Sequence, residues 1–329
     1  MDSDTPIDVV ITWVDGDDPV HRAKRHKYMH GGAEAKMEDI GGETRYRQVG
    51  EIFFCVASVL RFAPFVRKIF IVTDNQDPQL DNFISANFPG NTVPIEIIDH
   101  RVIFRNYEQY LPTFNSLSIT TMLWRIPGIS EHFILLNDDV MFTSPVKPTD
   151  FFTSDGFPLC YAKQWPVWWV KALHWLKSAL KGRKTFGFKD AQLKAREVAG
   201  AHGKFLYMGH TPHMLRRSFF EEFFTAQPAI LENQIRHRFR EPSQFSSVCL
   251  QYIVLHMRNQ CPIVPLHGKL VCMKPRPGQN GYFDRKLKEL GRPTVKFFCV
   301  NSLDKASVDE IKKLHNGLAQ VLNIKLTAR

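Results

Sequence analysis

The chain has 329 residues, of which 44% are hydrophobic and 23% are charged, and its formal net charge is +10. This is the composition of a globular protein with a substantial core, either one large α/β domain or a core with an added subdomain, and it excludes a disordered chain. The positive charge favours acidic partners, which include sugar nucleotides, polyanionic polymers, nucleic acids and anionic membranes.

Strand-like and helix-like segments alternate in the first half of the chain. β-branched and apolar runs predict strands at residues 7–14, 68–73, 93–98 and 133–136. Amphipathic segments predict helices at residues 48–62, 78–88 and 116–126. This alternation predicts a mostly parallel sheet flanked by helices. The glycine-rich stretch at residues 31–42 has no periodicity and is predicted to be a mobile loop.

The second half contains a helix with an unusual composition. Residues 165–180 place tryptophans and other apolar side chains at helical spacing, with basic residues on or beyond the polar side. Two interpretations stay open. The helix either packs in the core or lies on an anionic bilayer, where tryptophan is favoured. The basic residues are Lys171, Lys177, Lys181, Arg183 and Lys184.

The remaining elements are predicted with ordinary patterns. A stripe of phenylalanines at residues 215–224 and an apolar segment at 248–257 indicate buried helices. Residues 295–300 are typical of a late strand, and residues 306–322 of an amphipathic terminal helix.

The cysteines and the apolar runs bear on the compartment. The six cysteines form no CxxC pair and have no metal-type spacing, which indicates a reducing compartment. No apolar run reaches the roughly 18 residues that a spanning helix needs, and the first residues carry no signal-peptide hydrophobic region. We therefore expect a cytosolic protein or a soluble piece of a larger one.

Acidic turns follow two of the predicted strands. The strand at 133–136 runs into Asn-Asp-Asp at 137–139, and the strand at 7–14 runs into Asp-Gly-Asp-Asp at 15–18. Ligands of open α/β sheets bind at the carboxyl ends of strands, and adjacent carboxylates repel unless a cation or a reaction requires them. A shared acidic rim would bind Mg²⁺ or Mn²⁺, and the alternative is a pair of solvated turns. Asp8, inside the first strand, either bonds a backbone group or reaches this rim.

The sequence His-Thr-Pro-His at 210–213 offers two candidates for a general base. It follows a short apolar segment, 205–208, and is predicted to precede a helix, with Pro212 in the first turn. A helix N-terminus favours the neutral form of histidine, which suits a base. The alternative for His210 and His213 is a capping or packing role.

Two further segments carry candidate binding residues. Arg238 and Arg240 can hold phosphate with two hydrogen bonds each or form a solvated basic turn. Asn115 or Ser116 is expected to cap the helix that follows. The chain has no Walker loop, no GxGxxG and no GxSxG, which argues against a P-loop NTPase, a nicotinamide enzyme of the usual kind and a hydrolase of that type.

In order along the chain, these segments resemble the Stealth family. That family comprises bacterial capsular polysaccharide hexose-1-phosphate transferases and the catalytic part of the animal N-acetylglucosamine-1-phosphotransferase. The shortness of the chain favours the bacterial kind. The matching segments include IDVVITWVDGDD, LPTFNS with LNDDVMF, and MGHTPHML, and they lie at residues 7–18, 44–78, 111–142, 208–215, 239–245 and 297–304.

The resemblance implies a Rossmann-like, GT-A-like α/β fold. It divides the chain into a nucleotide-sugar-binding core at 1–160, an amphipathic helical insertion at 161–205 and the remainder of the catalytic domain at 206–329. The implied reaction transfers sugar-1-phosphate from a UDP-sugar to a hydroxyl of a growing capsular polysaccharide and releases UMP. The implied location is the bacterial cytoplasm, with peripheral contact to the inner membrane and no nucleic-acid partner.

The resemblance also implies roles for individual residues. Asp138 and Asp139 would hold Mg²⁺ or Mn²⁺ on the diphosphate, His210 or His213 would be the base, and Arg240 would stabilise phosphoryl charge. The donor site would be lined by Asp15, Gly16, Arg45, Asn115 and Asn301. Two other functions stay open, a conventional metal-dependent glycosyltransferase that releases UDP and a non-catalytic binder of sugar nucleotides or polyanions.

Overall fold

The computed structural model describes residues 5–29, 49–181, 186–275, 279 and 281–326. The predicted loop at 31–42 and the candidate residue Arg45 lie outside the described residues.

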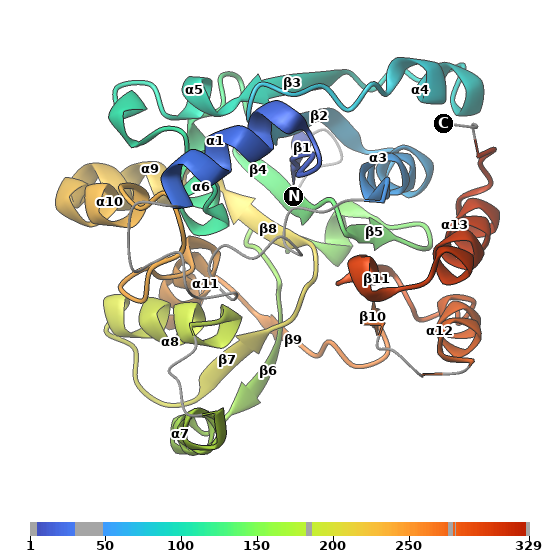
Figure 1. Cartoon of the computed structure of the whole chain (residues 1–329). Coiled ribbons are helices and arrows are strands. Elements are labelled where there is room, and N and C mark those ends of the chain that lie inside the picture. Colours follow the sequence, from blue (N-terminus) through green and yellow to red (C-terminus); the bar gives the residue numbers. More distant parts are fainter. Residues whose placement is uncertain (1–4, 30–48, 182–185, 276–278, 280, 327–329) are drawn as a thin grey trace.

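A five-stranded sheet runs through the centre of the molecule (Figure 1). Four of its strands are parallel, and the edge strand β8 runs antiparallel to its neighbour β4. The predicted mostly parallel sheet is therefore confirmed. In spatial order the strands are β3 (Ile95–Asp99), β2 (Val66–Thr73), β1 (Ile7–Thr12), β4 (His132–Asn137) and β8 (His213–Arg216).

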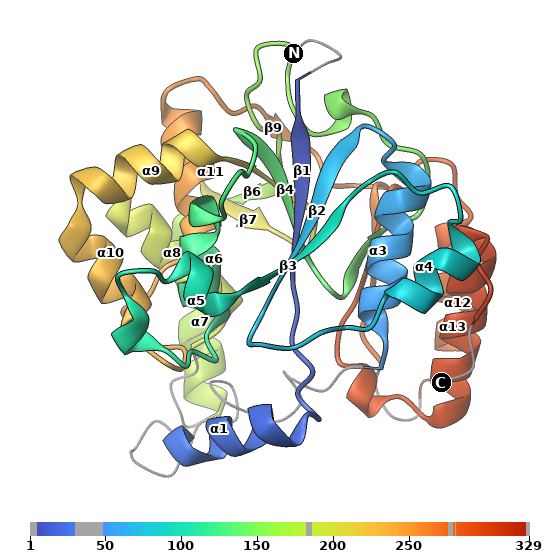
Figure 2. The ribbon, with the colours of Figure 1, turned by 90° about the horizontal axis from the view of Figure 1, so that it is seen from above.

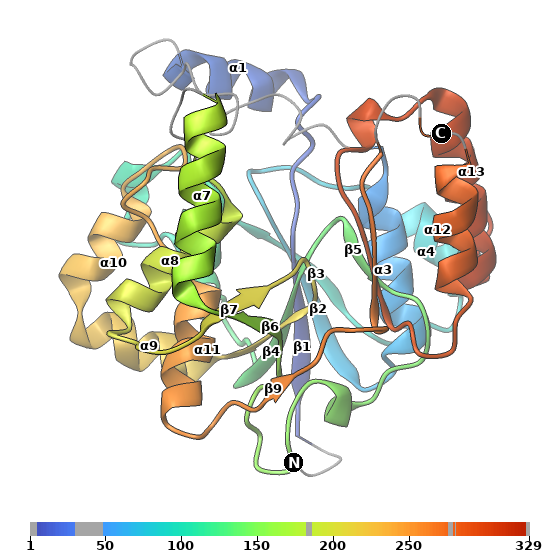
Figure 3. The ribbon, with the colours of Figure 1, turned by 90° about the horizontal axis from the view of Figure 1, so that it is seen from below.

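The central strands are apolar along their length because both faces of the sheet are covered. Successive side chains point to opposite faces, so Val9 and Ile11 enter one core and Val10 enters the other. Helices lie on both sides of the sheet (Figures 2 and 3). On one side are α3 (Glu51–Phe62), α4 (Asp81–Asn87), α12 (Tyr282–Leu290) and α13 (Val308–Leu322). On the other are α5 (His100–Ile103), α6 (Ser116–Met122), α8 (Phe188–Val198), α9 (Arg217–Ala226), α10 (Pro228–Ile235) and α11 (Ser247–Met257).

Two three-stranded sheets extend the central one. The first has the order β10-β11-β5, and its strand β5 begins directly after the acidic turn that ends β4. The acidic turn is therefore held between two sheets. The second has the order β7-β6-β9. The strands are β5 (Val140–Phe142), β6 (Cys160–Trp165), β7 (Phe205–Met208), β9 (Ile263–Val264), β10 (Leu270–Met273) and β11 (Phe297–Val300).

The predicted context of the His-Thr-Pro-His segment is wrong. His213 begins strand β8, whose four residues pair with β4, and helix α9 begins only at Arg217. Leu215, expected in the helix, is therefore a strand residue, and Pro212 precedes a strand. The edge of β4 requires a hydrogen-bonding partner, and pairing with it overrides the local helical pattern. The phenylalanine stripe itself is confirmed as core, with Phe219, Phe220 and Phe224 buried.

Helix α7 (Val167–Lys181) lies between β6 and β7, which pair with each other. Its tryptophans project into solvent, with Trp168 68% exposed, Trp169 49% and Trp175 73%. The prediction that this helix packs in the core is therefore wrong for its tryptophan face, and the bilayer interpretation stays a prediction. Within the described residues, no helix combines the length and the apolar character needed to cross a membrane.

Candidate active site

The turns after β1, β2 and β4 meet at one edge of the central sheet because these strands are parallel. Helix α1 (Pro19–Met29) lies across this edge (Figure 2). The Asp15–Gly16 turn is fixed there by Gln76, whose side chain accepts a hydrogen bond from the Asp15 N–H and donates one to the Asp15 carbonyl, each at 2.9 Å. The Asp15 carboxylate accepts from the Asp17 N–H at 2.9 Å. The predicted donor turn is thus a rigid feature of the rim.

Three carboxyl groups gather at this edge beside β4. Asp138 and Asp139 form the turn that follows β4, and Glu51 stands in the first turn of α3. Gly50 precedes this helix with φ of +92°, a conformation that favours glycine. The Asn301 side-chain amide donates to Asp139 Oδ2 from the end of β11. Asp138, Asp139 and Asn301 therefore lie together, as the family resemblance implies.

The carboxyl groups strongly perturb one another. Burial, followed by Asp139 and Glu51, raises the pKa of Asp138 well above its usual range. Burial and then Glu51 raise the pKa of Asp139 to about 7, against a smaller opposing effect of the Asn301 hydrogen bond. The main cause is burial, which penalises the ionised form, and the neighbouring carboxylates add to it. Such an acidic cluster favours protons or a cation.

The donor set fits a hard divalent ion. Asp139 Oδ1 is buried and accepts no hydrogen bond from the described residues, so a ligating oxygen remains available. In the described part of the chain, no three His, Cys, Asp or Glu side chains are arranged to hold a metal ion by themselves. Magnesium usually takes one or two carboxylates and completes its shell with water and substrate phosphate. Asp138 and Asp139 suit that mode of binding.

Strand pairing brings the histidines to the same edge. His213 pairs with Leu135, two residues before the end of β4, and His210 lies in the turn that precedes β8. The turn packs closely against the segment that leads into β10, since a Cβ at Gly209 would lie 3.2 Å from the Leu266 side chain and 3.7 Å from that of Leu270. The antiparallel strand β8 thus replaces the predicted helix as the element that positions these residues.

His210 faces the cationic side of the site. Burial lowers its pKa, and Lys274 and Arg240 lower it further. Its ring stacks on Phe188 with 4.9 Å between the centroids. Lys274 follows β10, and the preceding residue Met273 accepts a hydrogen bond from the Asn301 N–H at 2.9 Å. This contact connects the cationic side to the acidic side at Asp139.

His213 has a more enclosed environment. Burial lowers its pKa to about 4, with a smaller contribution from His210. Its ring centroid lies 6.3 Å from that of Tyr252, whose hydroxyl accepts a hydrogen bond from the Met214 N–H at 2.7 Å. Burial thus favours the neutral form of both histidines, although no helix terminus produces this effect.

Arg240 is positioned by the turn that begins α6. Its Nη2 donates to Ser116 Oγ at 2.6 Å. The buried Asn115 side chain caps α6 by accepting from the Leu117 N–H, as predicted, and donates to the Phe239 carbonyl at 2.8 Å. Asn115 is therefore engaged within the protein, where it fixes the segment that carries Arg240.

Sequence reasoning missed Glu51 and Lys274. Glu51 stands at the start of a highly apolar helix, and a carboxylate at the edge of such a segment was the available signal. Lys274 follows a short strand, and only the pairing of that strand with β11 brings it toward Asn301. Asp8, in contrast, lies away from the rim near the start of β1. Its carboxylate accepts two hydrogen bonds from Arg67, at 2.9 and 2.7 Å, and one from the Ser130 N–H.

Comparisons with known proteins identify a family and several relatives. The family description "Stealth protein CR1, conserved region 1" matches residues 5–33, and "Stealth protein CR2, conserved region 2" matches residues 45–159. The receptor polysaccharide phosphotransferase WefC of Streptococcus oralis is 32% identical over 266 residues, which cover 75% of this chain and 77% of that protein. The capsular polysaccharide phosphotransferase LcbA of Aeromonas hydrophila is 34% identical over 327 residues, which cover 96% and 84%.

The fold is also found among solved structures. The apo structure of the bifunctional glycosyltransferase WbbM matches with a TM-score of 0.53 at 10% identity, over 96% of this chain and 50% of that one. At this identity the likeness concerns the fold alone. The predicted Rossmann-like, GT-A-like architecture is confirmed.

Proposed function

Because the chain belongs to the Stealth family of polysaccharide phosphotransferases, we propose that it transfers sugar-1-phosphate from a UDP-sugar to a hydroxyl of a growing capsular polysaccharide. The acceptor oxygen forms a bond to the phosphorus that carries the sugar. The phosphoanhydride bond of the donor breaks, and UMP leaves. The acceptor proton passes to a base, and the product is a phosphodiester.

The observation that carries this proposal is the division of the rim into an acidic and a cationic side. Glu51, Asp138 and Asp139 form the acidic side, and Arg240 and Lys274 lie near the histidine on the other. Transfer of a phosphoryl group demands positioning, neutralisation of charge and removal of a proton. The two sides together supply groups for each demand.

On the acidic side, Asp138 and Asp139 would hold Mg²⁺ or Mn²⁺. When bound, such an ion neutralises diphosphate charge. Asn301 orients the Asp139 carboxylate by donating to one of its oxygens, and the other oxygen, which has no hydrogen-bond partner among the described residues, would be available to the ion. Glu51 adds negative charge beside the pair and strengthens its preference for a cation.

On the cationic side, Arg240 would bind the phosphoryl oxygens. A guanidinium can donate two parallel hydrogen bonds to phosphate, which fixes orientation as well as charge. Asn115 and Ser116 maintain the position of Arg240 through the α6 turn. Lys274 would add a second positive charge. The Asp15–Gly16 turn would contact the nucleotide portion of the donor, and Arg45 keeps its proposed donor role.

We assign the base to His210 and a positioning role to His213. His210 lies beside Arg240 and Lys274, where a phosphoryl group would be bound, and burial together with the two cations lowers its pKa and favours the neutral ring. His213 is the first residue of β8 and lies against Tyr252, so it supports the turn that carries His210.

Analysis of the nucleotide product tests the proposal. Purified protein is incubated with Mg²⁺, candidate UDP-sugars and a short acceptor, and the nucleotide released is identified by chromatography. UMP release supports phosphotransfer. UDP release would instead indicate a conventional glycosyltransferase, and the absence of turnover would favour a non-catalytic binder.

Variants sharpen this assay. We expect Asp139→Ala and His210→Ala to abolish UMP release. The matched controls Asp155→Ala and His202→Ala remove exposed groups of the same types and should retain activity. Equal activity in all four variants would contradict the assigned roles.

We further propose that the protein acts in the bacterial cytoplasm next to the inner membrane. The exposed tryptophans of α7 and the lysines of this helix support peripheral contact with an anionic bilayer.

A further inference from the structure

A pocket of about 630 Å³ lies beside the central sheet, and most of its walls lie away from the acidic rim. Its walls come from α5, the short helix η4 (Leu123–Arg125), the loop before β4 and the first turns of α9. The loop at 126–129 and Arg217 both adjoin the amino end of β4, whereas the acidic turn follows its carboxyl end. Six residues separate the two ends, which is roughly 20 Å at about 3.3 Å per residue.

The pocket is strongly basic. Four arginines line it together with a single carboxylate, that of Glu221, which pairs with Arg217. Within the described part of the chain, Arg101 and Arg105 form no ion pair, and both are exposed. Two unpaired guanidinium groups in one concave surface favour an anionic ligand.

Arg125 anchors the centre of the pocket. Its guanidinium donates to the Ile103 and Arg105 carbonyls at 2.8 and 2.6 Å and lies 5.3 Å from the Tyr107 ring centroid. Burial lowers the pKa of Arg125, and Arg105 lowers it further. The exposed Glu108 is close enough for both arginines to lower its pKa, although backbone hydrogen bonds have the larger effect. Arg125 therefore fixes the segment that carries Arg105, and it forms no ion pair with a carboxylate in the described residues.

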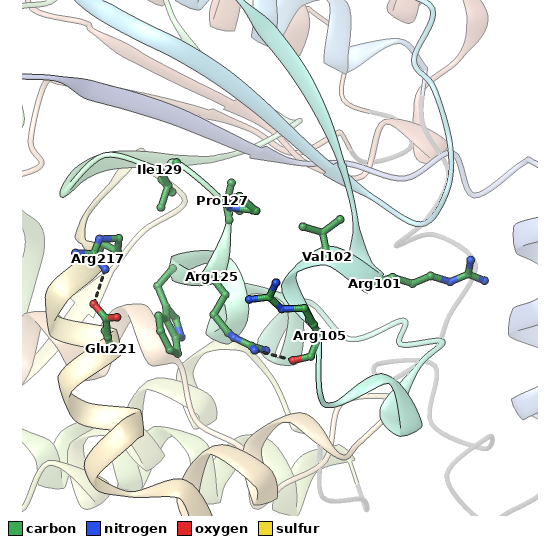
Figure 4. Close-up of a pocket in the computed structure, with 11 residues that line it drawn as sticks. Arg101, Val102, Arg105, Arg125, Pro127, Ile129, Arg217 and Glu221 are labelled. Atoms are coloured by element: carbon green, nitrogen blue, oxygen red, sulfur yellow. Dashed lines mark hydrogen bonds and ion pairs between the residues drawn. The ribbon is translucent and has the colours of Figure 1, made fainter.

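In Figure 4 the four arginines form a row, with Arg101 at one end, Arg217 at the other and Arg105 and Arg125 between them. The Arg101 side chain extends away from the other three. The row starts at α5, which follows the carboxyl end of β3, where His100 lies close to Asp74 of the rim. It thus extends from the neighbourhood of the proposed active site toward the opposite edge of the sheet.

Apolar side chains complete the pocket between the charges. Trp124, Val102, Ile126 and Pro127 contribute to its walls. A pocket that combines apolar surface with a few fixed polar groups suits a ligand that does the same. A phosphodiester-linked saccharide has this character, because sugar rings with apolar C–H faces alternate with singly charged phosphates. Guanidinium groups match those phosphates with paired hydrogen bonds.

We propose that this pocket binds a phosphodiester-linked segment of the polysaccharide at a distance from the reacting phosphorus. The inference rests on the proposed function, since that reaction creates such a polymer. The pocket retains the growing chain between transfers, and its occupant is the product of earlier cycles rather than the donor.

A binding assay without turnover tests the inference. The probe is a synthetic tetramer of hexose units joined by phosphodiesters, and the reference is a neutral tetramer of the same sugar. Calorimetry compares the wild type with the double variant Arg101→Ala/Arg105→Ala. The matched control is Arg258→Ala/Arg292→Ala, which removes two exposed arginines that do not line the pocket.

We expect the charged tetramer to bind the wild type more tightly than the neutral one. The pocket variant should weaken this binding about tenfold, and the control variant by less than about twofold, because only the first loses guanidinium groups at the site. Thermal unfolding checks that both variants remain folded. Transfer to a single-unit acceptor should be unchanged in the pocket variant.

Three results would overturn the inference. Equal binding of charged and neutral tetramers would show that phosphate is not recognised. Equal losses in the two double variants would indicate general attraction to a basic protein. Displacement of the tetramer by an equal concentration of inorganic phosphate would assign the pocket to free phosphate. Because binding is measured without turnover, a failure of the proposed reaction would not be confused with any of these.

Discussion

Asp139 combines a functional advantage with a cost in stability. Its pKa is raised to about 7, whereas an aspartate in an unfolded chain ionises near pH 4. Between these values the unfolded chain releases the proton first, so the free energy of unfolding falls as the pH rises toward 7. Above pH 7 the folded state contains an ionised carboxylate in an unfavourable position unless a cation is bound.

We therefore expect Asp139→Asn to stabilise the metal-free protein at pH 8. The gain in the free energy of unfolding should be about 1–2 kcal/mol, since the full effect of the pKa shift is reduced by partial solvent access. The gain should vanish near pH 4, and metal-dependent turnover should be lost. Urea unfolding at both pH values measures the difference, with the exposed Asp155→Asn as the control. A loss of stability at pH 8 would contradict the electrostatic account.

His210 determines a second pH dependence. A base must be neutral, and burial with two nearby cations lowers the pKa of His210 below its usual value. We expect kcat/KM, measured at saturating Mg²⁺, to stay level as the pH falls to about 6.5 and to decrease only at lower pH, since an ordinary histidine titrates near 6.5.

The variant that tests this assignment is His210→Gln. It keeps a polar side chain of similar size but cannot accept the proton, so the pH-dependent step should disappear along with most of the rate. His213→Gln should reduce the rate and keep the step. If kcat/KM of His210→Gln still decreased at low pH as it does in the wild type, the general base would have to be another group.

At the scale of elements, helix α7 differs most clearly from a buried helix, because its tryptophans are exposed. Trp168 and Trp169 are exposed and Val170 is buried, so the helix is attached to the protein by its other face. We expect Trp168→Ser/Trp169→Ser to reduce binding to vesicles that contain anionic lipid, because tryptophan is favoured at the bilayer interface.

Sedimentation with anionic and neutral vesicles measures this binding. Met257→Ser/Val308→Ser is the matched control, since it also removes two exposed apolar side chains, 56% and 67% exposed, from other helices. Equal binding of both double variants and the wild type would argue against contact through α7.

The misassignment of Leu215 to a helix also has a physical explanation. The phenylalanine stripe at 215–224 predicts a helix directly after the His-Thr-Pro-His segment, yet residues 213–216 form strand β8, which pairs with the open edge of β4. This long-range pairing decides both the strand and the position of His210 relative to the acidic turn. A local sequence pattern does not show which distant strand will pair with this edge.

At the scale of the whole molecule, the net charge of +10 should strengthen the binding of a polyanionic acceptor. We expect KM for a phosphodiester-linked acceptor to rise about tenfold between about 0.05 and 0.3 M salt, because screening shortens the range of attraction. KM for a neutral single-unit acceptor should change by less than about twofold over the same range. Initial rates with the two acceptors measure the contrast, and parallel changes would contradict it.

Much of the site could be predicted because it follows the ends of strands. The runs before Asp15 and Asp139 are apolar and short, and parallel strands necessarily place their ends at one edge. Asn301 was predicted at the site from the resemblance, and its hydrogen bond to Asp139 agrees with that position. Glu51 and Lys274 could not be predicted, since each reaches the rim from an element that packs there only in the folded protein.

The sequence alone determined the alternating strands and helices, the acidic turns and the family, because these depend on local periodicity and on short contiguous motifs. The tertiary structure decided which polar groups meet. Pairing of β8 with β4 and of β10 with β11 brings residues from distant parts of the chain to one rim, and it leaves a row of arginines beside the sheet. Side chains far apart in sequence become neighbours only when burial of the shared core fixes the strands that carry them.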